Sequence, residues 1–197
     1  MKSKSISYIV SAAMLAGTMV TGAASAQEFN WRAVTHQLPG TPRFEGTVTP
    51  FVECVGNASG GRMKIQAFGG GVLHPVPDSL DAVRDGVVQM GMIWPGYWAG
   101  KNPVFALAGS RPGDPITTFG ESFYREQALQ HIVAAAYEKE GVTSLGGFDF
   151  GPPEILNSAV EVRSLEDFKG KTVRSGGMGA TFYSALGASA VTLTGTE

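Results

Sequence analysis

"DFKGKTVRSGG", residues 167 to 177, combines the end of a short helix, a strand and a glycine turn. The segment KTVRS has the composition of a strand, and Gly176 with Gly177 marks the turn. A helical pattern over 178–187 and a strand pattern over 188–195 follow directly. The region therefore predicts a strand–helix–strand unit, which is the building block of parallel sheets.

The rest of the chain alternates between strand and helix patterns in the same way. We expect strands over residues 29–35, 62–68, 87–94 and 142–148, and helices over residues 43–59, 76–86 and 117–141. Ser164 and Asp167 have the spacing of a capping box, and so do Thr118 and Glu121. This order predicts an α/β fold with mainly parallel sheets, which bind ligands beyond the carboxyl ends of their strands.

The longest expected helix, over 117–141, carries an apolar stripe that predicts its buried face. The stripe consists of Tyr124, Ala128, Leu129, Ile132, Ala135 and Ala136. Cys54, the single cysteine, cannot form an internal disulfide, and we expect it to be buried on the helix over 43–59.

Residues 1–26 have the pattern of a secretory signal peptide. Lys2 and Lys4 precede an uncharged, mostly apolar run, and "ASA" at residues 24–26 fits the small-x-small rule for cleavage. The run is also about as long as a short membrane span, so a transmembrane anchor is the alternative. Cleavage after Ala26 would export the rest of the chain, which we expect in the periplasm.

The composition and the motifs argue against two classes of function. The chain has 15 Lys and Arg against 17 Asp and Glu, and it shows no basic patch of the kind that binds nucleic acid. It contains no Gly-x-Ser-x-Gly, Walker or His-Glu-x-x-His motif, and His36, His74 and His131 lack metal-ligand spacing. We therefore expect a protein that is not an enzyme.

Two features have the chemistry of a binding site. The aromatic loop "MIWPGYWAGKNP", residues 92–103, follows a strand, so Tyr97 and Trp98 could wall a pocket; the alternative is that they cap the core or pack the lobes together. Arg174 ends a strand before two glycines and a helix, where its planar guanidinium and the helix amides could hold a carboxylate. The alternative is a surface salt bridge with Glu166 or Asp167.

The order of several motifs resembles the solute-binding proteins of TRAP transporters, the DctP-like family. The matching segments are "GGRMKIQAFGGGVL", "SLDAVRDGVVQMGM", "GYWAGKNPVFAL", "VRSLEDFKGKTVRSGG" and "LGASAVTLTGTE". The segments "GKNP" and "RSGG" are most similar to the branch that binds keto acids and related monocarboxylates.

The resemblance implies a two-lobed, type II-like periplasmic binding protein. The first lobe would comprise residues 27–150, and the second lobe would begin at 151 and continue to 197. Members of the family are longer than this chain, and its last expected strand has no closing helix. We therefore expect a C-terminally truncated chain with an incomplete second lobe.

The resemblance also implies site residues and partners. The family's selecting arginine falls on Arg174, its aromatic pair on Tyr97 and Trp98, and its first cleft loop on His36 and Gln37. The branch has a glutamine that touches ligand and cation where this chain has Pro153. Further ligand candidates are therefore Glu154, which could also bind a bridging cation, and Asn157.

The expected function is capture of an organic acid for TRAP membrane subunits driven by an ion gradient. The expected partners are that acid and those subunits, with a homodimer left open and no cofactor beyond a bridging cation. An ABC-type receptor for another small solute is one alternative, and an exported enzyme is another.

Overall fold

The computed structural model describes residues 28–109, 111–147 and 156–195. The predicted signal peptide, Pro153, Glu154 and the predicted lobe boundary at 150/151 lie outside the described residues. None of the helices within those described ranges is both long enough and apolar enough to cross a bilayer.

A parallel three-stranded sheet forms the first part of the structure. Its strands are β1 (Phe29–Thr35), β2 (Met63–Phe68) and β3 (Met90–Met92), in the order β2-β1-β3. Ala33 in the central strand is opposite Ala67 on one side and Met90 on the other. The predicted strands over 29–35 and 62–68 are confirmed, whereas the third is only three residues long.

The first helix begins with a widened π turn, η1 (Phe44–Val48), and continues as α1 (Thr49–Ala58). Pro50 has no N–H to donate to the carbonyl four residues earlier, which weakens the α-helical pattern at this place. The Thr49 amide instead donates to Phe44, five residues back, as a π turn requires. Cys54 on α1 is exposed, so the expectation of a buried cysteine is wrong.

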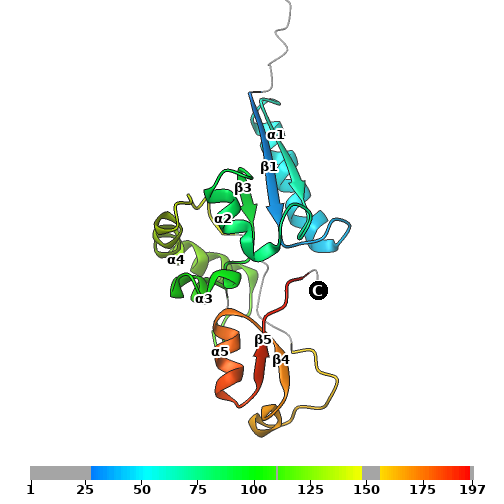
Figure 1. Cartoon of the computed structure of the whole chain (residues 1–197), viewed down its shortest axis with the longest axis vertical. Helices are drawn as coiled ribbons and strands as arrows, with labels where there is room; N and C mark the ends of the chain where they lie inside the picture. The colour runs from blue at the N-terminus through cyan, green and yellow to red at the C-terminus, as the bar shows by residue number, and fades with distance from the viewer. Residues whose placement is uncertain (1–27, 110, 148–155, 196–197) are drawn as a thin grey trace, which may run out of the picture.

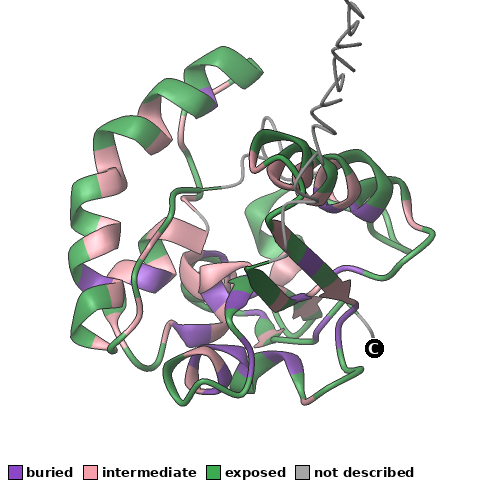
Figure 2. Cartoon of the chain, turned by 90° about the horizontal axis from the view of Figure 1, so that it is seen from above, coloured by how far each residue is buried: buried purple, intermediate pink, exposed green. Residues whose placement is uncertain are grey.

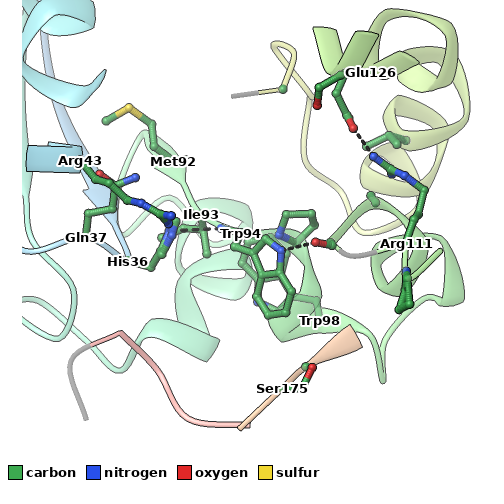
Figure 3. A pocket seen from close by; sticks show the side chains of 18 of the residues that line it. His36, Gln37, Arg43, Met92, Ile93, Trp94, Trp98, Arg111, Glu126 and Ser175 are labelled. Carbon is green, nitrogen blue, oxygen red and sulfur yellow. Dashed lines mark hydrogen bonds and ion pairs between the residues drawn. The ribbon is translucent and has the colours of Figure 1, made fainter. Parts of the chain in front are cut away.

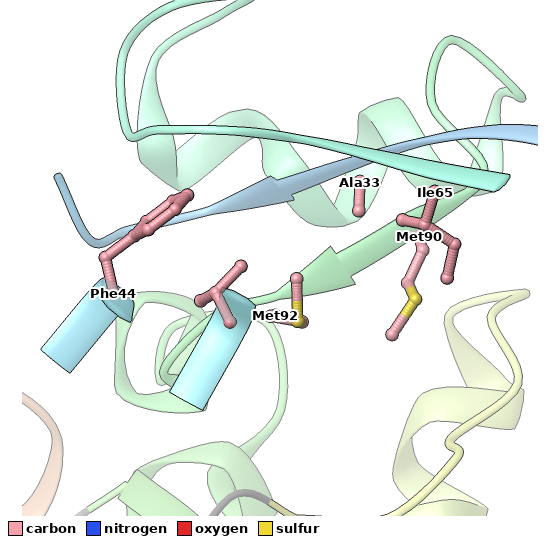
Figure 4. Close-up of a cluster of buried hydrophobic side chains, with 6 residues drawn as sticks. Ala33, Phe44, Ile65, Met90 and Met92 are labelled. Atoms are coloured by element: carbon pink, nitrogen blue, oxygen red, sulfur yellow. The ribbon is translucent and has the colours of Figure 1, made fainter. Parts of the chain in front are cut away.

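This helix and the sheet share the first hydrophobic core. Ala33, Phe44, Val48, Ile65, Met90 and Met92 form its buried centre, and Figure 4 shows these side chains converging between the strands and the helix. Their positions follow from the alternation of the strands, since every second side chain of a strand points to the same face.

The helix α2 (Ser79–Arg84), which follows η2 (Val76–Asp78), packs on the other face of the sheet, where Ala82 is buried with Val34 and Val88. The chain then forms η3 (Pro95–Trp98) and α3 (Pro103–Gly109), which contribute to a second core. Leu80, Trp98, Phe105 and Ala136 form the centre of this core.

The longest helix, α4 (Phe119–Lys139), begins at the predicted capping box of Thr118 and Glu121. Its expected apolar stripe is wrong as a buried face: Tyr124 is 75% exposed and Ile132 is 45% exposed. Ser122 and Ala136 are the residues of α4 that are buried, and Figure 2 shows most of this long helix as exposed or intermediate. Residues 142–147, where a strand was expected, form none.

A second parallel sheet has two strands. The elements here are η4 (Leu165–Phe168), β4 (Thr172–Arg174), α5 (Gly177–Ala185) and β5 (Ser189–Val191). Arg174 pairs with Val191, and the predicted capping box of Ser164 and Asp167 is present. The strand–helix–strand unit predicted from residues 167–195 is therefore confirmed.

We call the part built on β1–β3 the first lobe and the part built on β4–β5 the second lobe. Figure 1 shows that β1 and β3 point toward the second lobe, whereas β5 points back toward the first. The carboxyl ends of both parallel sheets therefore face each other. The helix α5 packs against α3 and η3, which joins the two lobes beside this meeting point.

Candidate functional site

A cleft of about 1630 Å³ lies where the two sheets meet. Its lining includes His36 and Gln37 after β1, Trp94 after β3, and Arg174 with Ser175 at the end of β4. Figure 3 shows several of these side chains around the cleft. The carboxyl ends of parallel strands thus supply its polar groups, as is usual for ligand sites in α/β proteins.

Arg174 is the last residue of β4 and lines the cleft. Its Nη2 donates to the carbonyl oxygens of Leu193 at 3.3 Å and Thr194 at 2.8 Å. No carboxylate of the described residues lies within ion-pair distance of it, so the predicted alternative of a salt bridge with Glu166 or Asp167 is not present. The N–H groups on Nε and Nη1 have no partner in the described part of the chain and can still donate.

Gly176 and Gly177 allow a close approach between the lobes rather than leaving open space. A Cβ on Gly176 would lie 2.7 Å from Cη2 of Trp94, and one on Gly177 would lie 3.0 Å from the carbonyl oxygen of Ala106. Any side chain at either position would meet the first lobe. These contacts place the start of α5, and with it Arg174, against η3 and α3.

The two predicted aromatics have different surroundings. Trp98 is 5% exposed, donates from Nε1 to the Pro77 carbonyl at 2.8 Å and packs on Phe105, although it also borders the cleft. Tyr97 is not among the lining residues. Its ring meets the edges of His36 and Trp94.

Trp94 is a cleft residue that the sequence analysis did not single out. Its Nε1 donates to the Gly109 carbonyl at 2.6 Å, and its ring lies edge-on to Tyr97 with centroids 5.1 Å apart. Figure 3 shows the indole at the centre of the cleft view. Its position directly after a buried strand was the available signal, because such positions lie at the carboxyl edge of the sheet.

His36 forms part of the floor of the cleft as a neutral ring. Burial lowers the pKa of His36, a hydrogen bond with the Met92 backbone opposes this shift, and the charge of Arg43 lowers the pKa further. The Trp94 amide donates to Nδ1 at 3.3 Å. At neutral pH the imidazole is therefore a structural hydrogen-bonding group and not a cation.

Gln37 and Asn157 both line the cleft, but they differ in burial. Gln37 is 8% exposed, whereas Asn157 is exposed. Glu154, the remaining candidate, lies outside the described residues.

A network of charges on the first lobe was also missed. Arg111 bonds to Asp114 and Glu126, and Arg125 bonds to Asp114. Arg111 also donates to the Leu107 carbonyl at 2.8 Å, which ties α4 to α3. These four side chains line the cleft, and the two positive charges are balanced by the two negative ones. Their separation along the chain left no local pattern to detect.

The described residues do not by themselves form a metal site. No three His, Cys, Asp or Glu side chains cluster closely enough within them to bind an ion. The expected bridging cation would therefore depend on Glu154 or on the ligand.

Two parallel sheets with facing carboxyl ends and a polar cleft between them define a two-lobed binding protein. The chain belongs to the bacterial extracellular solute-binding proteins of family 7, DctP, whose family model matches residues 33–197. It is 29% identical over 173 residues to the monocarboxylate 2-oxoacid-binding periplasmic protein of Nostoc sp., a match that covers 85% of this chain and 46% of that protein.

Solved structures have the same fold. DctP6, a Bordetella pertussis extracytoplasmic solute receptor binding pyroglutamic acid, matches with a TM-score of 0.73 and 25% identity over 84% of this chain and 54% of its own. A TRAP periplasmic solute-binding protein from Pseudoalteromonas atlantica T6c, with bound sodium and pyruvate, matches with a TM-score of 0.68 and 23% identity over 86% of this chain and 52% of its own. The chain thus spans about half the length of these relatives.

Proposed function

We propose that the chain is the solute-binding component of a TRAP-type transporter and captures an organic carboxylate in the periplasm. The membrane subunits of that transporter would receive the acid from it. The protein would act by binding and release, without chemical conversion of the acid.

Arg174 carries this proposal. It lies at the carboxyl end of β4 in the cleft, and its Nη2 is oriented by the carbonyls of Leu193 and Thr194. A guanidinium keeps its charge at all physiological pH values, and its remaining N–H groups can donate to a carboxylate. Keto and related acids are the proposed class, because the Nostoc relative is a monocarboxylate 2-oxoacid-binding protein.

The other cleft residues would surround the acid. Trp94 and Trp98 provide apolar surface in the lining, and the ring of Tyr97 packs edge-on against that of Trp94. His36, Gln37 and Asn157 would provide polar contacts. Glu154 stays a candidate for a cation that bridges to the acid, as sodium or calcium accompanies pyruvate in two solved relatives.

The test is titration calorimetry of the chain with pyruvate and pyroglutamate. Arg174→Lys should weaken binding by roughly 10- to 100-fold, because a charge-assisted hydrogen bond contributes about 1.5–3 kcal/mol and an ammonium cannot reproduce the planar donor set. Arg163→Lys is the matched control, since that side chain is 79% exposed. Unchanged affinity in Arg174→Lys would rule out this arginine as the carboxylate site.

A further inference from the structure

The side-chain amide of Gln37 is a buried polar group, and only part of its hydrogen-bonding capacity is used within the protein. The residue is 8% exposed, and its side chain has one contact in the described ranges, 3.4 Å between Oε1 and Thr47 Oγ1. Thr47 Oγ1 also donates to the Arg43 carbonyl at 2.5 Å, which is the shorter bond. The side-chain nitrogen Nε2 of Gln37 has no hydrogen-bond partner within the described ranges, and the residue lines the cleft.

The position of Gln37 is fixed by its backbone. Its amide donates to Thr35 Oγ1 at 3.2 Å, and its carbonyl accepts from the Gly70 amide at 3.1 Å. A Cβ on Gly69 would lie 3.2 Å from the same carbonyl, so the loop after β2 packs directly on this residue. These contacts hold the backbone of Gln37 on two sides, so the point from which the side chain starts is fixed beside the cleft.

Gln37 and Arg174 are connected by one short segment. Thr194 accepts the 2.8 Å hydrogen bond from Arg174, and the next residue, Gly195, passes over His36. A Cβ on Gly195 would lie 3.3 Å from the His36 carbonyl oxygen, one residue before Gln37. The segment 193–195 thus runs from the arginine to the first-lobe loop, and both Gln37 and Arg174 line the same cleft.

We propose that Gln37 is the first-lobe specificity residue and selects acids with a second hydrogen-bonding group remote from the carboxylate. This inference rests on the proposed binding of the carboxylate by Arg174. An acid with an alkyl end would leave the buried amide of Gln37 unsatisfied, and a site built around such a group rejects ligands that cannot pair with it. A hydroxyl suits either orientation of the amide, because it both donates and accepts.

The test uses pairs of acids that differ only by a hydroxyl in place of a methyl group. They are β-hydroxypropionate with butyrate, γ-hydroxybutyrate with valerate, and δ-hydroxyvalerate with caproate. Calorimetry on the chain should show about tenfold tighter binding of the hydroxy acid in at least one pair. Gln37→Leu should remove that preference, because the alkyl acid then leaves no buried amide unpaired and binds more tightly, while the hydroxy acid loses its partner. Gln37→Met provides a second variant if the leucine variant does not fold.

Gln66→Leu is the control, because Gln66 is an exposed residue of β2 outside the cleft and its loss should preserve the preference. Equal binding within every pair would overturn the role of Gln37 while leaving carboxylate binding in place. A preference that survives in both Gln37 variants would also overturn it. If no acid of the series binds although pyruvate or pyroglutamate does, this inference falls and the carboxylate proposal stands. If none of these acids binds, both fall.

Discussion

The indole ring of Trp94 lies against Gly176, where a Cβ would stand 2.7 Å from Cη2 of the ring. Trp94 follows β3 of the first lobe, and Gly176 is the N-cap of α5 in the second. Gly96 borders the same ring, since its Cβ would lie 2.2 Å from it. The ring therefore borders two glycines, one from each lobe, and a single residue, Ser175, separates Gly176 from Arg174.

Gly176→Ala should destabilise the protein by about 1–3 kcal/mol, because the added methyl group overlaps the indole ring and one of the two must move. Trp94→Phe removes the distal carbons of the ring, so the double variant should recover part of the lost stability. Urea unfolding measures both effects. Gly100→Ala is the control, since a Cβ there meets nothing within 4 Å. If Gly176→Ala and Gly100→Ala were equally stable, the Trp94 ring could accommodate a methyl group at residue 176 without cost.

The elements that could be predicted from the sequence are those that local interactions determine. The capping boxes at Thr118 and Ser164 place the starts of α4 and η4 through hydrogen bonds between residues three apart. The strands β1 and β2 were visible from their local composition, and β2 also from the glycines at residues 69–71 that follow it. These local signals were enough to predict an α/β fold with parallel sheets.

The buried face of α4 could not be predicted, because the helix has apolar residues on more than one side. Tyr124 and Ile132 belong to the expected stripe but are exposed, whereas Tyr137, outside that stripe, packs on Trp98 and Phe105. Burial raises the pKa of Tyr137 to about 12. The face that packs is set by contacts with Trp98 and Phe105, which belong to other elements than α4.

Which aromatic rings face the cleft could not be predicted from the sequence either. Trp94, Tyr97 and Trp98 fall within five residues, and the sequence alone does not tell which ring turns toward the ligand. A carbonyl of Pro77 holds Trp98 in the core, whereas a carbonyl of Gly109 holds Trp94 in the cleft. Pro77 and Gly109 both lie outside the loop of residues 92–103, so contacts with other segments decide which ring faces the cleft. The position of Arg174 at the end of a strand could be predicted, because the strand pattern and the glycines lie directly beside it.

Asp114→Asn should destabilise the protein by about 1–3 kcal/mol, because this carboxylate accepts from both Arg111 and Arg125 while its side chain is only 22% exposed. The two guanidinium groups would then face each other with Glu126 alone to balance them. Denaturant unfolding of the variant measures the loss. Glu161→Gln is the matched control: the Glu161–Arg163 pair is 69% and 79% exposed, and exposed pairs contribute about 0–1 kcal/mol. Similar effects of the two changes would contradict a stabilising network.

His36 should make the folded state sensitive to mild acid. Its pKa in the folded protein lies below the ordinary histidine value of 6.5 that it regains on unfolding, chiefly because of burial. The unfolded chain therefore binds more protons once the pH falls through about 6.5, so the stability present at higher pH is lost toward lower pH.

His36→Asn cannot titrate but keeps an acceptor for the Trp94 amide, and the free energy of unfolding of this variant should depend less on pH between about 7.5 and 5. His131→Asn, on the exposed side of α4, should keep the wild-type dependence. Parallel pH profiles for wild type and His36→Asn would show that the cleft floor does not need a neutral imidazole.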